Sequence, residues 1–505
     1  MPLPIGLSGD DHANCFASGL PRLQRNEPLA LPLKVLQFGE GNFLRAFFDW
    51  MIHGLNTQGL FNGSIRIVQP IPQGNGDTLN QQGGCYTTIL RGIEQGNTVE
   101  QCELITCVSG CTNPYEHWDA VVKDVCCETL EFIVSNTTES GIHYQPEPWQ
   151  RGQCPHSFPA KITSLLYERY LFFRGEAKKG LTFLPCELIE NNGGLLRTFV
   201  RQHAEDWKLE EGFLRWLDKE NHFVNTLVDR IVTGFPKDEY QSLCMKLGYN
   251  DELLSCGEMF HFFALECQPS LEEKLPLIQG GFNVVITSDL KPYRDRKVRF
   301  LNGAHTAIAL AAHLNGFETV DETIGDPLFA TYLKRLLFEE IYPTVLLPDV
   351  EKTTFAHSIL ERFANPFIKH RLLSIALNSV SKWKVRVLPS LLDYRQLTGK
   401  FPALMAFSLA ALIVFYRNRN GISSTGHLIE DAPEVVKFFE TVWSNYDNEN
   451  NSHNLAESAL GNNEFWGCDL NEIPELTENI AALINQIVAL GIRKTLSHLL
   501  DSPSA

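Results

Sequence analysis

The sequence has no apolar run long enough to cross a lipid bilayer. The longest, FPALMAFSLAALIVFY at residues 401–416, is shorter than the roughly 20 residues that a spanning helix needs, so it predicts a buried core helix. The N-terminal segment MPLPIGLSGDD also lacks a basic stretch followed by an apolar one, which is the pattern of a secretory signal. We therefore expect a cytoplasmic protein with no membrane partner.

Positive charge is also scarce. The 505 residues include 43 lysines and arginines against 60 aspartates and glutamates, and the formal net charge is -17 at pH 7. Such a surface repels a polyanion, which argues against nucleic acid or an anionic membrane as a partner. A local basic patch can still bind a small anion, so acidic metabolites remain candidate small-molecule substrates. A chain of this length is expected to form two or more domains.

The 13 cysteines lack the spacing of a metal site or of a disulfide framework. Five of them crowd into residues 102–127, but no CxxC pair and no HxxxH companion accompanies them. Their odd total also prevents complete pairing. We expect reduced thiols that pack as small buried hydrophobic groups, and no bound metal.

The stretch VLQFGEGNFLRAF, residues 35–47, lacks the third glycine of a dinucleotide-binding fingerprint. Its context is still that of a nucleotide site, because residues 33–39 predict a strand and residues 42–56 have apolar residues at helical spacing. The first glycine permits a tight turn, and the second permits the backbone to approach a pyrophosphate. The alternative is an ordinary strand-to-helix turn. The predicted cofactor-binding residues are Gly39, Glu40, Gly41, Asn42, Phe43, Leu44, Arg45 and Ala46.

An acidic residue for the adenosine ribose is missing as well. The second predicted strand, residues 64–70, ends in Gln69 and Pro70, and no acid follows before Asp77. A glutamine can hydrogen-bond a ribose hydroxyl, but the fingerprint calls for Asp or Glu at this point. This stretch therefore leaves the choice between NAD and NADP open.

Strand and helix patterns alternate as far as residue 290, and helices dominate beyond it. Further strands are predicted at residues 131–139, 181–189 and 281–290, which is typical of βαβ units and a parallel sheet. From residue 291 onward the apolar residues recur at helical spacing. The sequence predicts an α/β fold, with a Rossmann-like nucleotide-binding domain of mostly parallel sheet over residues 1–290. A mainly α-helical substrate-binding and catalytic domain is expected over residues 291–505.

The segment DLKPYRDRKVRFLNGAHTA, residues 289–307, places polar groups on one side of a predicted helix. If that helix advances by about 100° per residue, one sector about 140° wide holds Lys297, Arg294, Asn302 and His305. A desolvated lysine can exchange protons near neutral pH, an asparagine amide can stabilise a developing oxyanion, and a histidine can orient a hydroxyl. The alternative is a solvated basic face with a core histidine. A third stretch, PCELIENNGG at residues 185–194, can place an Asn side chain in a cleft, although it is also a plain turn sequence.

Together these three stretches resemble the polyol-specific long-chain dehydrogenases, the mannitol dehydrogenase family. The family has an early G-x-G-x-F turn, matched by GEGNF at residues 39–43, and a later K-x4-N-x2-H helix, matched by Lys297, Asn302 and His305. The resemblance implies NAD as the cofactor and a hydride transfer that needs no metal. It also implies that Lys297 is the general acid and base and that His305 positions the substrate. Asn302 and Asn192 are implied to polarise the carbonyl oxygen.

Within the family, the chain is most similar to members that use NADH to reduce D-tagaturonate to D-altronate in hexuronate catabolism. The supporting stretches include QFGEGNFLRAF, GGCYTTILRG and KWKVRVLPSLLDY, and they span most of the chain. Lys382 matches a substrate-contacting lysine of the family, whereas the family arginine eight residues earlier is Ser374 here. Because a uronate carboxylate needs a cation, we expect Arg294 or Arg386 to bind it.

Three alternatives remain open at the level of the sequence. The same chemistry can act on fructuronate to make mannonate, or on a neutral ketose such as fructose in the manner of a mannitol dehydrogenase. A different class of protein, a nucleotide-binding sensor without activity, would keep the fold and would not need a proton donor. The oligomeric state is left open.

Overall fold

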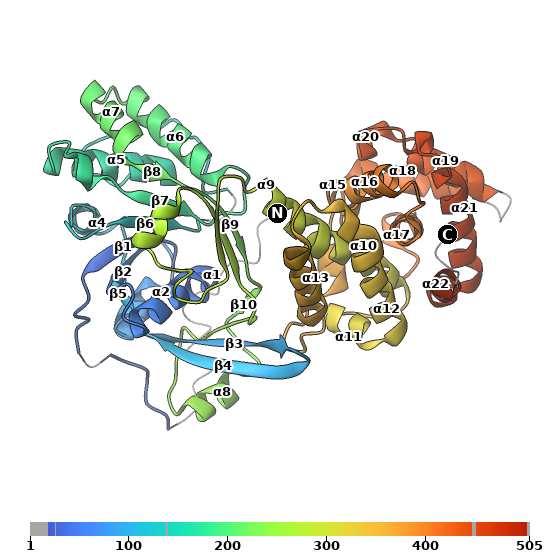
Figure 1. The fold of residues 1–505 in the computed structure, drawn as a ribbon, viewed down its shortest axis with the longest axis horizontal. Coiled ribbons are helices and arrows are strands. Elements are labelled where there is room, and N and C mark those ends of the chain that lie inside the picture. Colours follow the sequence, from blue (N-terminus) through green and yellow to red (C-terminus); the bar gives the residue numbers. More distant parts are fainter. Residues whose placement is uncertain (1–18, 26, 138–139, 447–450, 502–505) are drawn as a thin grey trace. The chain divides into compact units, whose positions relative to one another are not determined.

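The computed structural model describes residues 19–25, 27–137, 140–446 and 451–501. The chain divides into two compact units, one of residues 1–91 with 98–290 and the other of residues 92–97 with 291–505. Figure 1 shows a unit of strands and helices in blue and green, and a helical unit in yellow to red. The predicted fold class, a Rossmann-like α/β part followed by a mainly helical part, is confirmed.

The first unit is built on a six-stranded sheet of order β5-β2-β1-β6-β7-β8. All of its neighbouring strands run parallel. Its strands are β1 (Leu33–Phe38), β2 (Ser64–Val68), β5 (Val108–Thr112), β6 (Phe132–Ser135), β7 (Thr182–Pro185) and β8 (His222–Phe223). Parallel strands bury both faces, and successive side chains alternate between them. Val35 accordingly packs into one hydrophobic cluster, while Leu36 and Phe38 pack into another.

Helices supply the rest of both clusters. The helices of the first unit are α1 (Asn42–Arg45), α2 (Phe48–Thr57), α3 (Gly76–Gln81), α4 (Trp118–Val125), α5 (Phe158–Phe172), α6 (Asn192–Asp206), α7 (Glu211–Glu220) and α8 (Tyr240–Leu247), with short 3-10 turns at Ala177–Lys179 and Pro269–Glu273. Side chains of α2 join the cluster of Val35, and side chains of α4 to α7 join the cluster of Leu36. The sheet is therefore covered on both faces, as a Rossmann-like fold requires.

The helix predicted over residues 42–56 is broken into α1 and α2. The break falls at Ala46 and Phe47, and Phe47 has φ -128° and ψ -80°, outside the helical range. The kink stacks Phe43 on Phe47, with ring centroids 5.0 Å apart. Apolar spacing alone did not reveal the break, because both pieces bury the same face.

Two smaller sheets were not predicted, although the strand predicted over residues 281–290 is present in one of them as β13. One has the order β10-β11-β3-β4 and the other β13-β12-β9. Their strands are β3 (Tyr86–Glu94), β4 (Asn97–Ile105), β9 (Asn225–Asp229), β10 (Val232–Gly234), β11 (Ser255–Gly257), β12 (Phe262–Glu266) and β13 (Val284–Thr287). Between β3 and β4 only Gln95 and Gly96 intervene, and both have positive φ, which is the geometry of a tight hairpin.

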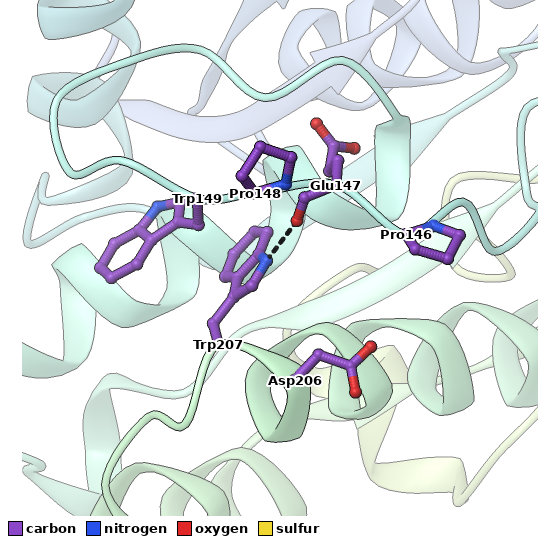
Figure 2. A pocket seen from close by; sticks show the side chains of 6 residues that line it. All are labelled: Pro146, Glu147, Pro148, Trp149, Asp206 and Trp207. Atoms are coloured by element: carbon purple, nitrogen blue, oxygen red, sulfur yellow. Dashed lines mark hydrogen bonds between the residues drawn. The ribbon is translucent and has the colours of Figure 1, made fainter.

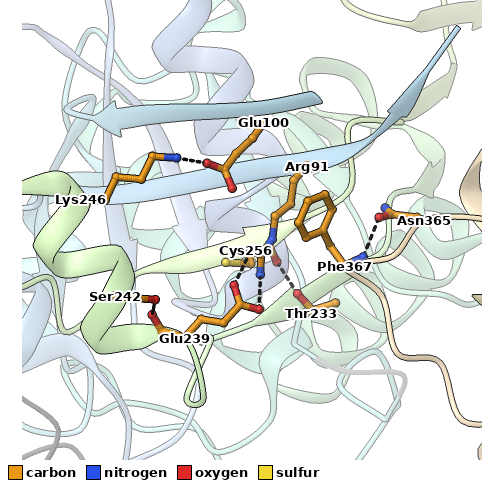
Figure 3. A network of polar contacts seen from close by, with 9 residues as sticks. All are labelled: Arg91, Glu100, Thr233, Glu239, Ser242, Lys246, Cys256, Asn365 and Phe367. Carbon is orange, nitrogen blue, oxygen red and sulfur yellow. Dashed lines mark hydrogen bonds and ion pairs between the residues drawn. The ribbon is translucent and has the colours of Figure 1, made fainter. Parts of the chain in front are cut away.

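Ion pairs fasten the β3–β4 strands to α8 (Figure 3). Arg91 of β3 pairs with Glu239 just before α8, and Lys246 of α8 pairs with Glu100 of β4. Arg91 is nearly buried while Glu239 is half exposed, so the contact sits at the edge of a small apolar cluster. The network therefore stabilises this part of the first unit.

The second unit is almost entirely helical. Its α-helices are α9 (Lys291–Arg296), α10 (Ala304–Leu314), α11 (Val320–Gly325), α12 (Pro327–Arg335), α13 (Asp349–Phe363), α14 (Leu372–Ala376), α15 (Ser379–Arg386), α16 (Leu388–Thr398), α17 (Ala403–Phe415), α18 (Pro433–Ser444), α19 (Ser452–Leu460), α20 (Asn463–Trp466), α21 (Leu476–Leu490) and α22 (Ile492–Asp501). Two π-helical segments, η4 (Lys297–Gly303) and η5 (Leu336–Ile341), interrupt the series, and β14 (Asn418–Arg419) pairs with β15 (Ile422–Ser423).

The apolar run at residues 401–416 forms the core helix that was predicted. In α17 every residue after Ala403 is buried, and the helix contacts α10 and α21. A helix that is apolar on all sides lies in the middle of a domain. Across the described ranges, none of the helices combines the length and the apolar character that a bilayer span needs.

Candidate active site

The G-x-G turn lies at the carboxyl end of β1, in the middle of the six-stranded sheet. Gly39 has φ +125°, and a Cβ there would lie 2.9 Å from the backbone oxygen of Asn136, so only glycine fits. Nothing lies within 4 Å of the position that a Cβ of Gly41 would take. The turn thus leaves open space beside its second glycine, where the backbone of such a fold approaches a pyrophosphate.

The side chains after the turn point into the core. Leu44 is 1% exposed and belongs to the cluster of Val35, which explains why leucine stands in place of the third glycine. Arg45 and Ala46 are buried, and their N–H groups donate to the carbonyls of Gly41 and Asn42. The Arg45 guanidinium donates to the Glu40 and Leu253 carbonyls and to Asn42 Oδ1, and the predicted contact of Arg45 and Ala46 with a cofactor stays a prediction.

The end of β2 carries no acid. Gln69 is buried, and its Nε2 donates to the carbonyl oxygens of Ile71 and Pro72, both at 2.8 Å. The glutamine therefore holds the loop after β2 in place. A pocket of about 220 Å³ opens beside it, at the carboxyl ends of β1, β2 and β6. Its lining includes Ile71, Tyr115 and the buried Lys161, whose Nζ donates to the Tyr115 hydroxyl at 3.2 Å.

Another pocket of the first unit has a volume of about 460 Å³, and the residues that line it include Trp149 and Trp207 (Figure 2). Trp149 stacks on Trp207 with ring centroids 5.4 Å apart, and Trp207 Nε1 donates to the Glu147 carbonyl at 3.0 Å. These contacts attach the segment Pro146–Trp149 to the end of α6. The sequence singled out none of these residues.

Asn192 is the first residue of α6, and both atoms of its side-chain amide form hydrogen bonds within the protein. The side chain is 1% exposed, and its Nδ2 donates to the carbonyl oxygens of Pro185 at 2.9 Å and Glu187 at 3.2 Å. Its Oδ1 accepts the N–H of Thr226 at 2.9 Å. The amide ties β7, α6 and β9 together. These partners hold the Asn192 amide in place, and its role in polarising a substrate carbonyl stays a prediction.

The motif of Lys297, Asn302 and His305 lies in the second unit, and its first two residues belong to a π-helix. Lys297 and Asn302 lie in η4. In a π-helix the carbonyl of residue i accepts the N–H of residue i+5, whereas in an α-helix it accepts the N–H of residue i+4. The wider turn invalidates the rotation of 100° per residue that was assumed for this segment. π-helical turns inside α-helices are frequent at functional sites. No described residue accepts from or donates to the Asn302 amide, which is half-buried.

Gly303, which follows Asn302, has a packing role. A Cβ at Gly303 would lie 2.9 Å from the backbone oxygen of Arg386, at the end of α15. The glycine therefore allows the backbone of α15 to approach the lysine helix closely. This contact accounts for an Asn-Gly pair that is unfavourable for helix propensity.

His305 lies in a buried basic environment. Its ring stacks on Phe363 with centroids 3.9 Å apart and meets the ring of His370 edge-on at 5.1 Å. Burial, together with the charges of His370, Arg362 and Arg386, lowers the pKa of His305 well below its usual range. The imidazole is therefore neutral at neutral pH, with one nitrogen that donates and one that accepts.

Lys382 and Arg386, both of α15, lie near His305. Lys382 Nζ donates to the Ile375 carbonyl at 2.9 Å, and Arg386 Nη1 makes a long contact of 3.4 Å with Thr306 Oγ1. Burial and the neighbouring Arg386 lower the pKa of Lys382 to about 8, against the opposing effect of Asp431. Within the described ranges no carboxylate lies within ion-pair distance of either cation. We refer to Lys382, Arg386 and His370 as the basic cluster.

The two arginines that precede Lys297 differ in burial, since Arg296 is buried and Arg294 is half-buried. Arg296 is buried, its guanidinium lies 4.3 Å from the Phe355 ring centroid, and its Nη1 lies 4.0 Å from Glu351 Oε2. It is therefore a packing residue. Arg294 is half-buried in α9, and Ser374, where the resemblance led us to expect an arginine, is exposed. In the described part of the chain no three or more His, Cys, Asp or Glu side chains gather as a metal site would require.

A parallel sheet with a G-x-G turn after its first strand, followed by a helical unit, defines a class of two-part Rossmann-type dehydrogenases. Two solved structures share this architecture. One is a Pseudomonas fluorescens mannitol 2-dehydrogenase in ternary complex with NAD and D-mannitol, with a TM-score of 0.66, 21% identity, and coverage of 96% of this chain and 98% of that one. The other is a D-sorbitol dehydrogenase in substrate-free form, with a TM-score of 0.75, 19% identity, and coverage of 94% and 98%.

The chain belongs to the mannitol dehydrogenase family. Residues 33–279 match the mannitol dehydrogenase Rossmann domain, and residues 289–488 match the mannitol dehydrogenase C-terminal domain. Curated relatives include the altronate oxidoreductase of Bacillus subtilis (strain 168), which is 41% identical over 92% of this chain and 95% of its own length. The altronate oxidoreductase of Escherichia coli O6:K15:H31 (strain 536 / UPEC) is 41% identical over 93% of this chain and 97% of its own length.

Proposed function

We propose that this protein is an NAD-dependent altronate oxidoreductase, which interconverts D-altronate and D-tagaturonate by reversible hydride transfer at a CH–OH group. Relatives of that name cover more than nine-tenths of the chain at 41% identity. The observation that carries the choice of a sugar acid is the basic cluster, whose cations have no carboxylate partner among the described residues. A neutral polyol does not need such a cluster, whereas a uronate carboxylate does.

The cofactor in this proposal is NAD, bound at the turn of Gly39 to Gly41. The open space beside Gly41 suits a pyrophosphate, and the pocket at the carboxyl ends of β1, β2 and β6 suits the adenosine half. When bound, NADH supplies the hydride for reduction of the ketone. The direct cofactor contacts are assigned to residues 39–44, through their backbone or side chains.

Lys297 is proposed as the general acid that protonates the carbonyl oxygen in reduction and as the base in the reverse direction. The unpartnered amide of Asn302 donates to the same oxygen as negative charge develops on it. His305, held neutral by its surroundings, orients a substrate hydroxyl. The scheme uses no metal ion, and it takes Asn302 as the first candidate for the amide that polarises the carbonyl and Asn192 as the second.

Lys382 and Arg386 are proposed to bind the substrate carboxylate. Arg386 presents a planar fork that can make two parallel hydrogen bonds to it. Because a surface of net charge -17 disfavours anions elsewhere, a half-buried cluster without an acidic partner is a favourable place for one. Arg294 remains the second candidate for this role.

We also propose that the enzyme works in the cytoplasm on a small-molecule substrate and without nucleic acid. All cysteines in the described part of the chain are free thiols, and several of them are buried, which suits a reducing compartment.

The assay is the oxidation of NADH or NADPH, followed by absorbance, with D-tagaturonate, D-fructuronate and D-fructose. D-tagaturonate with NADH is expected to have the highest kcat/KM. Lys297→Met should lower kcat by roughly 10²- to 10⁴-fold, the size of a general acid's contribution, and leave NADH binding unchanged. Lys291→Met, which removes an exposed lysine of the preceding helix α9, is the matched control and should retain full activity.

Each other outcome selects a different function. A higher kcat/KM with D-fructuronate assigns the protein to mannonate oxidation, and a higher value with D-fructose assigns it to a neutral ketose. NADH binding without oxidation of any substrate indicates a nucleotide sensor.

A further inference from the structure

Two buried side chains donate hydrogen bonds to the backbone carbonyls of the G-x-G turn. Gln37, in β1, is fully buried, and its Nε2 donates to the Gly39 carbonyl at 3.1 Å. Arg45 is 3% exposed, and its Nε donates to the Glu40 carbonyl at 3.1 Å. Both donors lie on the core side of the turn, so the two carbonyls point inward.

We propose that Gln37 and Arg45 are positioning residues that orient the turn's N–H groups toward the pyrophosphate of the dinucleotide. A trans peptide is planar, and its C=O and N–H point in opposite directions. Holding the Gly39 carbonyl inward therefore turns the N–H of Glu40 outward. Holding the Glu40 carbonyl inward turns the N–H of Gly41 outward in the same way. The inference rests on the proposed use of NAD.

The outward side of the turn is a place for an anion. No described residue accepts the N–H of Gly41, and the space beside it is open. The Glu40 carboxyl already lies against the N–H groups of Glu40 and Asn75, which lower its pKa while burial raises it more.

Further contacts hold the two positioning side chains. Gln37 Nε2 also lies 3.4 Å from Asp49 Oδ2, which accepts the Tyr86 hydroxyl at 2.7 Å. Arg45 Nη2 donates to Asn42 Oδ1 at 2.7 Å, and its Nη1 donates to the Leu253 carbonyl. All of these groups except the half-buried Asn42 are buried, so their geometry is rigid.

The arginine also contributes charge. Its guanidinium lies 5.1 Å from the Tyr86 ring centroid. Burial lowers the pKa of Arg45, and the nearby Asp251, Asp49 and Glu40 oppose that effect. A cation therefore lies beneath the turn, on the side opposite to the pyrophosphate. Its field adds to the attraction of the N–H groups for a phosphate.

The test compares NADH affinity, by fluorescence titration of the full chain, in two variants and two matched controls. Gln37→Met removes the donor to Gly39 with little change of shape, and Arg45→Lys keeps the charge but removes the donor fork. Asn221→Leu and Arg169→Lys are the controls, because Asn221 and Arg169 are buried side chains that bind backbone carbonyls elsewhere in the unit. Melting temperatures are measured for all four.

Gln37→Met and Arg45→Lys should raise the Kd for NADH and the inhibition constant of ADP-ribose by about tenfold, the loss expected when one hydrogen bond to a charged group is misdirected. Inhibition by adenosine, which has no pyrophosphate, should stay unchanged, and so should KM for D-tagaturonate at saturating NADH. The controls should lower the melting temperature and keep the Kd for NADH.

Two results overturn the proposal. One is NADH affinity at the wild-type level in both variants, and the other is an equal loss of NADH affinity in the controls. If the wild-type chain itself does not bind NADH, the proposed function fails instead.

Discussion

At the scale of the residue, the proposed carboxylate site of the second unit rests on Lys382 and Arg386, for which no carboxylate of the described residues lies within ion-pair distance. Arg296 shows the opposite case, because a phenyl ring and Glu351 surround its guanidinium. Lys382 and Arg386 instead lie beside each other and beside His370, so their charges repel one another. A bound carboxylate relieves that repulsion, which gives the site a preference for an anion.

The basic cluster predicts a pH dependence of substrate binding. The pKa of Lys382 is lowered to about 8 by burial and by Arg386, with Asp431 opposing and His370 facing it. The lysine is charged below that pH and loses its proton above it. We therefore expect KM for D-tagaturonate to rise as pH increases through about 8.

Steady-state kinetics between pH 6.5 and 9.5 check this prediction. In Lys382→Met, KM should be higher at low pH and should not rise further at high pH, so the ratio of variant to wild type falls with increasing pH. A constant ratio would exclude Lys382 as the titrating group. Arg386→Met should raise KM at every pH, whereas a rise in Arg294→Ala alone would assign the carboxylate to Arg294.

At the scale of the element, the π-helical segment η4 decides how the lysine helix presents its polar groups. The strand pattern of LKVLQFG at residues 33–39 correctly predicted β1, because alternation of two buried faces is visible in the residues themselves. The π-helix was not predictable in that way. Gly303, at its end, closely approaches the backbone of α15, and this contact joins segments that are distant in sequence.

Gly303→Ala tests this packing. The added Cβ would lie 2.9 Å from the backbone oxygen of Arg386, and backbone atoms cannot move aside as a flexible side chain does. We expect the stability to fall by about 1–3 kcal/mol, the usual cost of overpacking, and kcat/KM to fall because Arg386 shifts relative to His305. Chemical denaturation and kinetics measure the two effects. Gly316→Ala has open space around its Cβ but a positive φ, so it serves as a control for stability loss away from this contact.

At the scale of the whole molecule, each unit has its own core, and the proposed cofactor turn belongs to the first. A ligand that binds only the folded protein stabilises it by an amount set by its concentration relative to its Kd. NADH at 100 times its Kd is expected to add about 2.7 kcal/mol to the free energy of unfolding of the transition that includes the first unit.

Calorimetry with and without NADH measures this effect. Lys297→Met should show the full stabilisation, because the proton donor is not needed for cofactor binding. Arg45→Lys should show less at the same NADH concentration, because its Kd is expected to be higher. Stabilisation by D-tagaturonate alone with none from NADH would contradict the assignment of the cofactor turn.

Local patterns in the sequence determined the class of the protein, the order of its two parts, the parallel sheet, the glycine turn and the core helix at residues 401–416. These features depend on the periodicity of apolar residues and on backbone positions that only glycine can take, and both are properties of neighbouring residues.

The tertiary structure decided which partners the predicted site residues have within the protein. Asn192 and Arg45 are polar residues in promising motifs, and the fold gives their hydrogen-bonding groups backbone carbonyls as partners. Lys382, Arg386 and His305 gathered because α15 approaches the lysine helix at Gly303. Contacts between segments far apart in the chain set these outcomes, since a buried polar group must be satisfied by whichever partner the fold brings to it.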